Sequence, residues 1–486
     1  MSIASQTPDS TRLRLLRSRW AQLPQDHWVA LPVLLAGTFM IVLDFFIVNV
    51  ALPSMQTDLH ASRSATEWFV AGYGLTFATG LITAGRLGDR FGRRRMFSLG
   101  LALFTLASIG CAAAGSAGAL ILARLAQGLA AALISPQVLS IIGIKYPGTD
   151  RVRALSIYGV VMGLAAVGGQ IIGGFLIQAD ISGLGWRSIF LINVPVGLAA
   201  LALAPRLVPE SRAETPPRLD LVGALWISVA LVALVLPLTE GRQHGWPAWA
   251  WLSLALAPVL FVSFACYQRR LARDGGSPLL PPALFGERTF SAGLVIQLGL
   301  WCGQASFFLV LSLYLQRGRG LTALHAGLVF SILAVAFVAT SLRAPGWMMR
   351  YGRRLIATGA LILAAGDLLL LACVSVIGTG GSVAVLAPGL LLVGAGQGLC
   401  ITSITATVLS SLDPQRAGAA AGVLSTMQQV GNALGVAVVG VVFFGSLNDG
   451  FAHAFTLSLV ELAALLLGVA ALTRLLPKEG HDDRPR

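Results

Sequence analysis

The residues best able to do chemistry in this chain are four ionisable side chains inside long apolar runs. They are Asp44, Arg124, Asp367 and Glu461. A charge inside a run long enough to cross a membrane is costly to keep there, so it usually serves a function. A buried carboxylate can take up and release a proton, and a nearby guanidinium favours its charged form. Proton binding is therefore the chemistry that these positions indicate.

Asp44 and Arg124 lie at similar depths in their runs. Asp44 precedes Leu52, the outer end of the first run, by eight residues, and Arg124 follows Gly118 by six. At about 1.5 Å of helix rise per residue, the two side chains lie roughly 12 Å and 9 Å from the outer face. We expect them to form one proton-coupling network. The alternative is a static ion pair that only aids packing.

The composition is that of an all-α polytopic membrane protein. Of 486 residues, 56% are hydrophobic and 11% are charged, whereas soluble domains carry about 25% charged residues. The net charge of +13 does not indicate a nucleic-acid partner, because the basic residues fall in alternate loops. The cysteines lie inside apolar runs and the histidines are scattered without ligand spacing, so we expect no metal site and no cofactor.

Fourteen apolar runs are long enough to cross a bilayer as helices. The runs lie near 28–52, 66–86, 96–114, 118–143, 154–179, 188–206, 220–240, 246–268, 289–315, 322–343, 355–377, 383–410, 416–443 and 454–475. Of the 34 Lys and Arg residues, 28 fall on the side of the two chain ends, five on the other side, and Arg124 within a run. This bias predicts a cell-membrane protein with both termini in the cytoplasm.

The turn between the second and third runs, residues 85–95, carries five arginines and one acid. Its glycines allow helix ends to approach closely. We expect a conformational latch in which the acid accepts hydrogen bonds from arginines, and the alternative is a solvated basic hairpin. The latch residues are Gly85, Asp89, Arg90, Gly92, Arg93 and Arg94.

An internal repeat divides the chain into two parallel halves. Residues 90–94 recur as 350–354, and Gln127-Gly-Leu recurs as Gln397-Gly-Leu. Two halves of this kind are typical of secondary transporters. We predict a cytoplasmic segment 1–27, a six-helix half 28–206, a linker with an inserted helix pair 207–268, a cytoplasmic connector 269–288, a second six-helix half 289–475 and a cytoplasmic tail 476–486.

Four segments resemble signatures of the major facilitator superfamily, and within it the fourteen-span drug:proton antiporters. They are Leu43-Asp-Phe-Phe-Ile-Val-Asn-Val-Ala-Leu-Pro53, the Arg-rich turn 85–95, Arg124-Leu-Ala-Gln-Gly128 and Trp186-Arg-Ser-Ile-Phe-Leu-Ile-Asn-Val-Pro-Val-Gly197. The resemblance implies the major facilitator fold, with two six-helix halves plus two inserted helices. It also implies proton-driven export of amphipathic small molecules by alternating access.

The fifth run departs from the antiporter signature, which has a proline after its first glycine. This chain has Gln170 there, within a motif of Gly169, Gln170, Gly173 and Gly174. A proline would kink the helix, whereas glutamine keeps the helix hydrogen bond and adds a polar group. The remaining glycines allow close packing of helices.

Amide and indole side chains in other runs are candidates for lining a substrate cavity. Residues three, four or seven apart on a helix share a face, and amides in membranes otherwise serve as contacts between helices. The candidates are Asn49, Gln297, Trp301, Gln304, Gln428 and Asn432. The resemblance places Asp367 and Glu461 on peripheral helices away from this cavity, as second choices for the proton site.

Several other functions are disfavoured by the sequence. The two lysines, Lys145 and Lys478, lie in no Gly-rich phosphate loop, so we expect neither an ATPase nor another enzyme. The partners that we expect are a small-molecule substrate, protons and the lipid bilayer, with the protein functioning as a monomer. The alternative function is proton-coupled uptake or export of a specific metabolite by the same fold.

The predicted orientation can be tested by cysteine labelling. A cysteine in place of Ser54, at the outer end of the first run, should react with an impermeant thiol reagent added outside. A cysteine in place of Ser211, in an inside segment, should not react. The reverse pattern in intact cells would overturn the orientation.

Overall fold

The computed structural model describes residues 28–213, 220–241, 244–410 and 417–476, and its regular elements in these ranges are all helices. The predicted N-terminal segment 1–27 and nearly all of the tail lie outside the described residues. The first half contains α2 Ala30–Asp58, α3 Arg63–Phe91, α4 Arg93–Ala112, α5 Ala117–Lys145, α6 Gly148–Ala179, α7 Ser188–Leu191 and α8 Asn193–Leu207. The helices α9 Leu221–Glu240, α10 Ala248–Arg273 and the short α11 Ala283–Gly286 follow. The second half contains α12 Arg288–Leu313, α13 Ala323–Tyr351, α14 Arg353–Ile377, α15 Ala387–Ser410, α16 Ala417–Gly445 and α17 Phe451–Leu472.

Each predicted apolar run forms a helix, with α7 and α8 together making the sixth. Thirteen of the described helical segments are long and apolar enough to cross a membrane. The remaining predicted run forms α3, which has 29 residues and carries Arg86, Asp89 and Arg90 in its last turns. The prediction of an all-α polytopic membrane protein is confirmed.

Local sequence signals start several of these helices. The hydroxyls of Ser62 and Ser116 accept hydrogen bonds from the first-turn amides of α3 and α5, at 3.2 Å and 3.3 Å. Such caps satisfy donors that the helix itself leaves free. Gly92 separates α3 from α4 with a φ of +109°, a backbone conformation that favours glycine.

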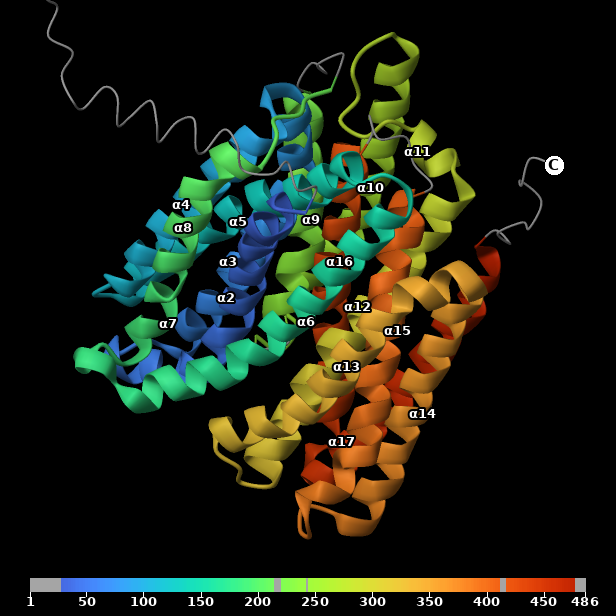
Figure 1. Ribbon diagram of the computed structural model, residues 1–486. Helices are drawn as coiled ribbons and strands as arrows, with labels where there is room; N and C mark the ends of the chain where they lie inside the picture. Colours follow the sequence, from blue (N-terminus) through green and yellow to red (C-terminus); the bar gives the residue numbers. More distant parts are fainter. Residues whose placement is uncertain (1–27, 214–219, 242–243, 411–416, 477–486) are drawn as a thin grey trace, which may run out of the picture.

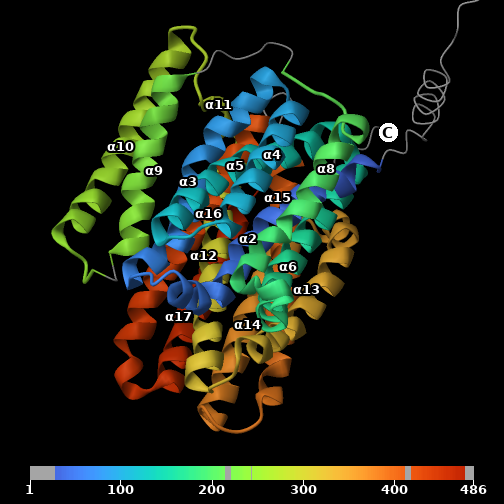
Figure 2. The same ribbon diagram turned by 90° about the vertical axis from the view of Figure 1, so that its left-hand side faces the viewer.

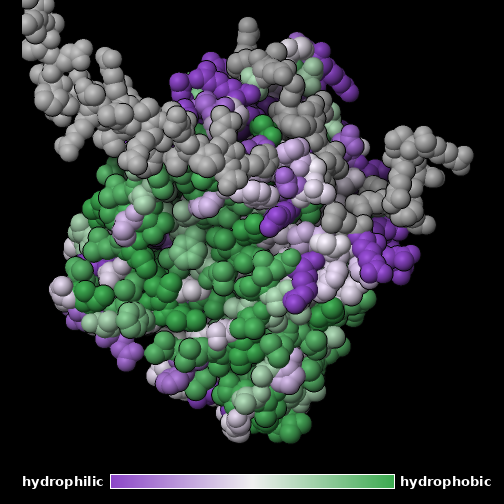
Figure 3. All heavy atoms as spheres, viewed as in Figure 1, coloured by the Kyte–Doolittle hydropathy of each residue, from purple (hydrophilic) through white to green (hydrophobic). Residues whose placement is uncertain are grey.

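The two halves lie side by side, with the first in blue to green and the second in yellow to red (Figure 1). They meet chiefly through α6 against α13 and through α3 against α16. The inserted pair stands at one side, where α9 contacts α3 and α16 and α10 packs on α9 (Figure 2). On the face shown in Figure 3, hydrophobic side chains cover most of the middle, and hydrophilic side chains gather mainly toward the upper end.

The internal repeat is also visible in how the helices pack. A Cβ built on Gly128 of α5 would lie 2.3 Å from the Tyr73 carbonyl oxygen, and one on Gly398 of α15 would lie 2.5 Å from that of Phe337. Beside each glycine a threonine hydroxyl, from Thr76 or Thr340, donates across the same helix pair. The contact between α3 and α5 therefore recurs between α13 and α15.

These close approaches predict which glycines the fold requires. Gly128→Ala and Gly398→Ala should each lower the yield and thermal stability of the purified protein, because a backbone carbonyl cannot move away cheaply. Overpacking of this kind typically costs about 1–3 kcal/mol. Gly110→Ala is the matched control, since its Cβ would meet nothing closer than 3.7 Å. Equal melting temperatures for all three variants would contradict the prediction.

Candidate functional site

Asp44 on α2 and Arg124 on α5 form an ion pair in the interior of the first half. Both side chains are fully buried, and Arg124 Nη1 donates to Asp44 Oδ2. Arg124 Nε donates to the Phe69 carbonyl at 2.7 Å, and its guanidinium carbon lies 4.4 Å from the centre of the Tyr73 ring. Asp44 and Arg124, which we expected to be partners from their similar depths in two apolar runs, are therefore in direct contact.

Three further side chains complete this group, which we call the Asp44 cluster. Gln127 Nε2 donates to Asp44 Oδ1 at 2.8 Å, and Asn193 Nδ2 on α8 donates to the same oxygen at 3.0 Å. Ser108 Oγ on α4 accepts from Gln127 at 2.9 Å and from Asn193 at 3.3 Å. Asp44 thus accepts hydrogen bonds from three donors, Arg124, Gln127 and Asn193. Loss of the Asp44 charge would leave the buried Arg124 cation without its partner.

The C-terminal end of α2 is tied to the segment that leads into α8. Asp58 Oδ2 accepts from Trp186 Nε1 at 3.0 Å and from Arg187 Nη1 at 2.8 Å. The hydrogen bond from Trp186, and then that from Arg187, lowers the pKa of Asp58 below its usual value. These contacts fix the start of the helix that carries Asn193.

The glycine motif of the fifth run packs directly on α2 beside Asp44. A Cβ on Gly169 would lie 3.0 Å from the backbone nitrogen of Ile47, and one on Gly173 would lie 2.7 Å from Ile47 Cγ1. Gln170 Nε2 donates to the Phe46 carbonyl at 3.3 Å. Gly174 has more room, with its nearest neighbour, Leu324 of α13, 3.7 Å from an added Cβ.

The Arg-rich turn between α3 and α4 is held by a buried ion pair. Arg93 Nη2 lies 2.5 Å from Asp89 Oδ1, and the two side chains are 2% and 1% exposed. Arg90 lies over the ring of Phe91, at 5.5 Å, and Gly85 is buried within α3. Asp89 is therefore packed inside this turn and not solvated, contrary to the alternative of a hydrated hairpin.

The segment after α8 closes over the same turn. Glu210 Oε1 accepts from the Arg94 backbone nitrogen at 3.1 Å, and Glu210 Oε2 lies 3.7 Å from Nε of both Arg94 and Arg95. Ala213 N donates to the Asp89 carbonyl at 3.1 Å. On the other side of the turn, Arg86 donates to two backbone carbonyls of the connector, at 2.5 Å and 2.6 Å.

A cavity of about 520 Å³ lies between the halves. Four phenylalanines and Trp301 provide aromatic surface, and none of the described residues that line it is ionisable. Its polar wall is formed by Gln304, Gln428, Gln429 and Asn432. Trp301 Nε1 and Gln304 Oε1 are buried without hydrogen-bond partners, so they are free to bind a ligand. Gln297 lines an adjoining cavity of about 350 Å³ with Trp301 and Gln428.

Asn49 does not line the cavity, contrary to prediction. Its side chain is exposed, and its Nδ2 donates to the Phe45 and Phe46 carbonyls of its own helix, each at 3.3 Å. Asp44 is also absent from the cavity wall, although Phe45 and Phe46 belong to it. Substrate in the cavity would contact the neighbours of Asp44 and not Asp44 itself.

Asp367 lies closer to the cavity than its helix suggested. α14 is peripheral in the bundle, but Asp367 is buried in a separate cavity whose wall includes Gln304 of the central cavity. Glu461 on α17 is half-buried, and its Oε2 has no hydrogen-bond partner. The structure therefore brings neither of these acids into contact with the Asp44 cluster.

Sequence reasoning missed Ser108 and Glu210. It quoted Gln127 and Asn193 only as members of the repeat or of signature segments and assigned them no role in the site. Gln127 lies three residues after Arg124 and so shares its helix face, a signal that was available. Asn193 interrupts an apolar run, which was also a signal for function. Glu210 follows the last apolar residues of the first half and shows no pattern of its own.

Comparison with known proteins gives consistent matches over almost the whole chain. The "Probable actinorhodin transporter" of Streptomyces coelicolor is 37% identical, covering 93% of this chain and 79% of that protein. The "Cephamycin export protein CmcT" of Amycolatopsis lactamdurans is 35% identical, covering 94% of each chain. The "Puromycin resistance protein pur8" of Streptomyces alboniger is also 35% identical, covering 92% of this chain and 90% of that protein.

Solved structures show the same fold at low sequence identity. The human organic anion transporter MFSD10 (TETRAN) has a TM-score of 0.65 at 17% identity, covering 93% of this chain and 100% of that one. The proton:xylose symporter XylE has a TM-score of 0.65 at 17% identity, covering 92% and 94%. The family model described as Major Facilitator Superfamily matches residues 34–436. The resemblance found in the sequence is confirmed, and the chain belongs to the major facilitator superfamily.

Proposed function

We propose that the chain is a proton-driven exporter, a drug:proton antiporter, of amphipathic small molecules such as antibiotics, dyes or cationic drugs. The observation that carries the proposal is the buried ion pair between Asp44 on α2 and Arg124 on α5. The helix α2 also lines the aromatic cavity between the halves. Members of this superfamily are transport proteins. The relatives named for export or resistance support the outward direction.

Proton and substrate act on the same helix in this proposal. Protonation of Asp44 removes the negative charge that Arg124 faces and leaves only neutral acceptors around the guanidinium, among them Gln127 Oε1 and the Phe69 carbonyl. In the proposed cycle α2 then shifts against α5. Substrate packs on Phe45 and Phe46, which directly follow Asp44 on α2 and line the cavity. Because both ligands bias the position of α2, binding of the proton and binding of substrate weaken each other, and this coupling is reciprocal.

The cavity chemistry defines the substrate class. Aromatic faces suit flat apolar groups and also attract cations, while the free polar atoms of Trp301 and Gln304 supply hydrogen bonds. The halves contact each other on both sides of the cavity. Ser135 Oγ and Ser425 Oγ lie 3.4 Å apart on one side, and the rings of Phe46 and Phe308 lie 5.8 Å apart on the other. Alternating access would require one of these contacts to open at a time.

Location and orientation follow from the same proposal. The charge bias supports a cell-membrane protein with both termini and the Arg-rich turn in the cytoplasm, functioning as a monomer. Arg212 is a second inside position for cysteine labelling, because it is exposed whereas Ser211 packs on the Arg-rich turn through its carbonyl.

Proton-coupled uptake or export of a specific metabolite is the alternative function for this fold. The two are distinguished by counterflow in vesicles with an imposed pH gradient, using a chemical panel of dyes and antibiotics. Drug susceptibility of a host without its own exporters gives an independent readout. Transport of a single metabolite, with no response to the panel, would support the alternative.

The central prediction concerns the proton site. Asp44→Asn should abolish ethidium efflux driven by a pH gradient in proteoliposomes, because an amide cannot take up the coupling proton. Exchange of ethidium without a gradient should continue. Ethidium that is still concentrated against its gradient by Asp44→Asn would place the proton site elsewhere.

Two controls separate lost coupling from lost folding. Breaking a buried ion pair from one side costs about 3–5 kcal/mol, because the partner charge stays buried. The double variant Asp44→Asn with Arg124→Gln removes both charges, so it should recover expression but not gradient-driven efflux. Asp449→Asn removes a carboxylate that is 73% exposed and should transport normally.

The Arg-rich turn is predicted to hold the outward-open state. Asp89→Asn should lower transport per molecule of expressed protein, because Arg93 loses its buried partner. It should also increase alkylation from the cytoplasmic side of a cysteine placed at the buried Ser425, in a protein whose exposed Cys266 is replaced by serine.

An exposed ion pair provides the matched control for the turn. Arg270 and Asp274 lie 3.9 Å apart with side chains that are 86% and 68% exposed, and such pairs contribute about 0–1 kcal/mol. Asp274→Asn should leave both transport and alkylation unchanged. Normal transport by Asp89→Asn would restrict the turn to a purely structural role.

A further inference from the structure

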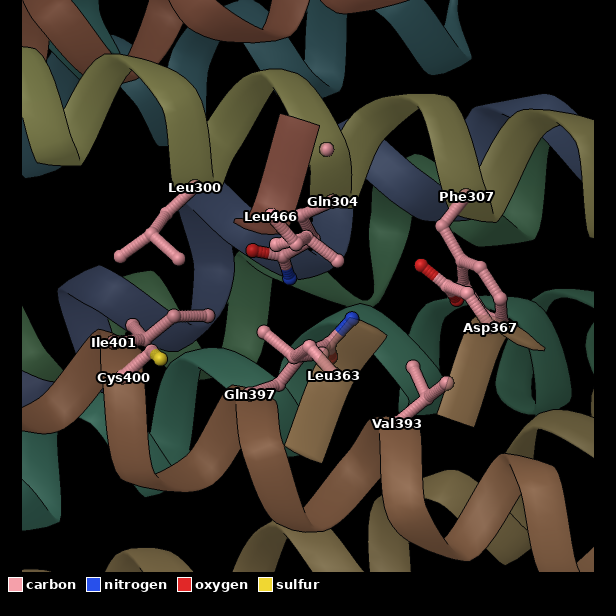
Figure 4. A pocket seen from close by; sticks show the side chains of 11 residues that line it. Leu300, Gln304, Phe307, Leu363, Asp367, Val393, Gln397, Cys400, Ile401 and Leu466 are labelled. Carbon is pink, nitrogen blue, oxygen red and sulfur yellow. The ribbon is translucent and has the colours of Figure 1, made fainter. Parts of the chain in front are cut away.

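A second group of buried polar side chains lies in the second half, away from the Asp44 cluster. Asp367 on α14, Gln304 on α12 and Gln397 on α15 line a cavity of about 330 Å³. In Figure 4 the two glutamines reach into the same space from facing helices, and Asp367 lies beside Phe307. Most of the remaining wall is apolar, from Leu300, Leu363, Val393, Ile401 and Leu466.

Asp367 lies among these residues without a partner. Its side chain is 2% exposed, and Oδ1 has no hydrogen-bond partner. Among the residues that the structure describes, it forms no ion pair. The one other titratable group in the cavity wall is Cys400. The remaining titratable groups on helices packed against α14 are His325, Arg343, Arg350 and Tyr351 on α13, His453 and Glu461 on α17, and Arg474 beyond it, with Arg353, Arg354 and Cys373 on α14 itself.

A buried carboxylate without a cation is several kcal/mol less stable than its neutral acid, because desolvation of the charge is not compensated. A neutral carboxylic acid instead needs ordinary hydrogen-bond partners, which the amides of Gln304 and Gln397 can supply across the cavity. We propose that Asp367, with Gln304 and Gln397, forms a second proton-binding site in the C-terminal half. This inference rests on the proposed proton-driven function.

The internal repeat supports this assignment. Ser108 of the Asp44 cluster lies 15 residues after Arg93, and Asp367 lies 14 residues after the matching Arg353. Gln397 is the counterpart of Gln127, which hydrogen-bonds Asp44 and Ser108 in the first half. The second half therefore keeps the amide of the Asp44 cluster at Gln397, and Asp367 lies one residue from the position that matches Ser108.

The counterpart of Arg124 is different in the second half. With the spacing of Gln127 to Gln397, Arg124 corresponds to Gly394. A Cβ on Gly394 would lie 2.1 Å from the Leu333 carbonyl oxygen, so the packing of α13 on α15 leaves no space for a guanidinium. Asp44 thus has a cation in direct contact, whereas Asp367 forms no ion pair among the described residues.

The second site adjoins the substrate cavity. Gln304 and Ile401 line both the Asp367 cavity and the cavity between the halves. A change in the Gln304 side chain would connect the two spaces, because Gln304 Oε1 is not held by a hydrogen bond. A proton on Asp367 could then exchange with the central cavity during the transport cycle.

Infrared spectroscopy of the purified protein tests the bound proton without any substrate. The wild type at neutral pH should show a carbonyl band of a protonated carboxyl group, and Asp367→Asn should lose one component of it. Asp367→Glu should keep that component at a shifted frequency, and Asp449→Asn should keep it unchanged. Absence of the band from the wild type, or identical spectra for the wild type and Asp367→Asn at every pH, would overturn the proposal.

A transport measurement tests whether the proton is exchanged. At an imposed tenfold proton gradient without membrane potential, each coupled proton supports about a tenfold ethidium gradient. Asp367→Asn should therefore lower the sustained ethidium gradient about tenfold. Asp44→Asn should still abolish the gradient, because in the proposed cycle α2 shifts only when Asp44 is protonated and the Asp367 proton is exchanged only in that cycle. Asp449→Asn should leave the gradient unchanged. An unchanged gradient in Asp367→Asn would overturn the exchange. A wild type that sustains no gradient would refute the proposed function, while the infrared band would still decide whether Asp367 binds a proton.

Discussion

A charge buried in the middle of a bilayer must be neutralised, and the first half of this protein is organised around one such pair. Asp44 and Arg124 are fully buried, and the donors to Asp44 come from α5 and α8. The cluster therefore joins helices that are distant in sequence. The same contacts couple the site to protonation, because a proton on Asp44 would weaken the hydrogen bonds that all of its donors make to it.

The two halves of the repeat meet this constraint in different ways. The first half pairs its acid with Arg124, whereas the second half has Gly394 at the matching position and packs two helix backbones there. Asp367 is left with amides as the nearest polar groups of its cavity. Two copies of one helical pattern thus differ in whether a buried acid has a cation beside it, and one part of this difference is the residue at a single matched position on α5 and α15.

Sequence predicted the helices well because apolar runs of membrane length have few alternative structures. Depth along two such runs was also enough to bring Asp44 and Arg124 together. The extent of the cavity and the direction of single side chains were harder to predict from sequence. Asn49 lies three and four residues after Phe46 and Phe45 and so shares a helix face with these cavity residues, but the cavity wall ends before it and its side chain is exposed. Asp367 was assigned to the periphery from its helix, although its side-chain direction depends on how α14 packs against α15.

The helix α3 links the features that the proposed cycle requires. The Phe69 carbonyl of α3 accepts from Arg124, so the N-terminal part of α3 contacts the Asp44 cluster. A Cβ on Gly422 of α16 would lie 3.0 Å from the Leu81 carbonyl, so α3 also contacts the second half. Its last turn carries Asp89, which is paired with Arg93. A shift of α2 and α5 after protonation of Asp44 would therefore also move α3. Because α3 contacts the second half and carries Asp89, this motion would reach both the second half and the Arg-rich turn.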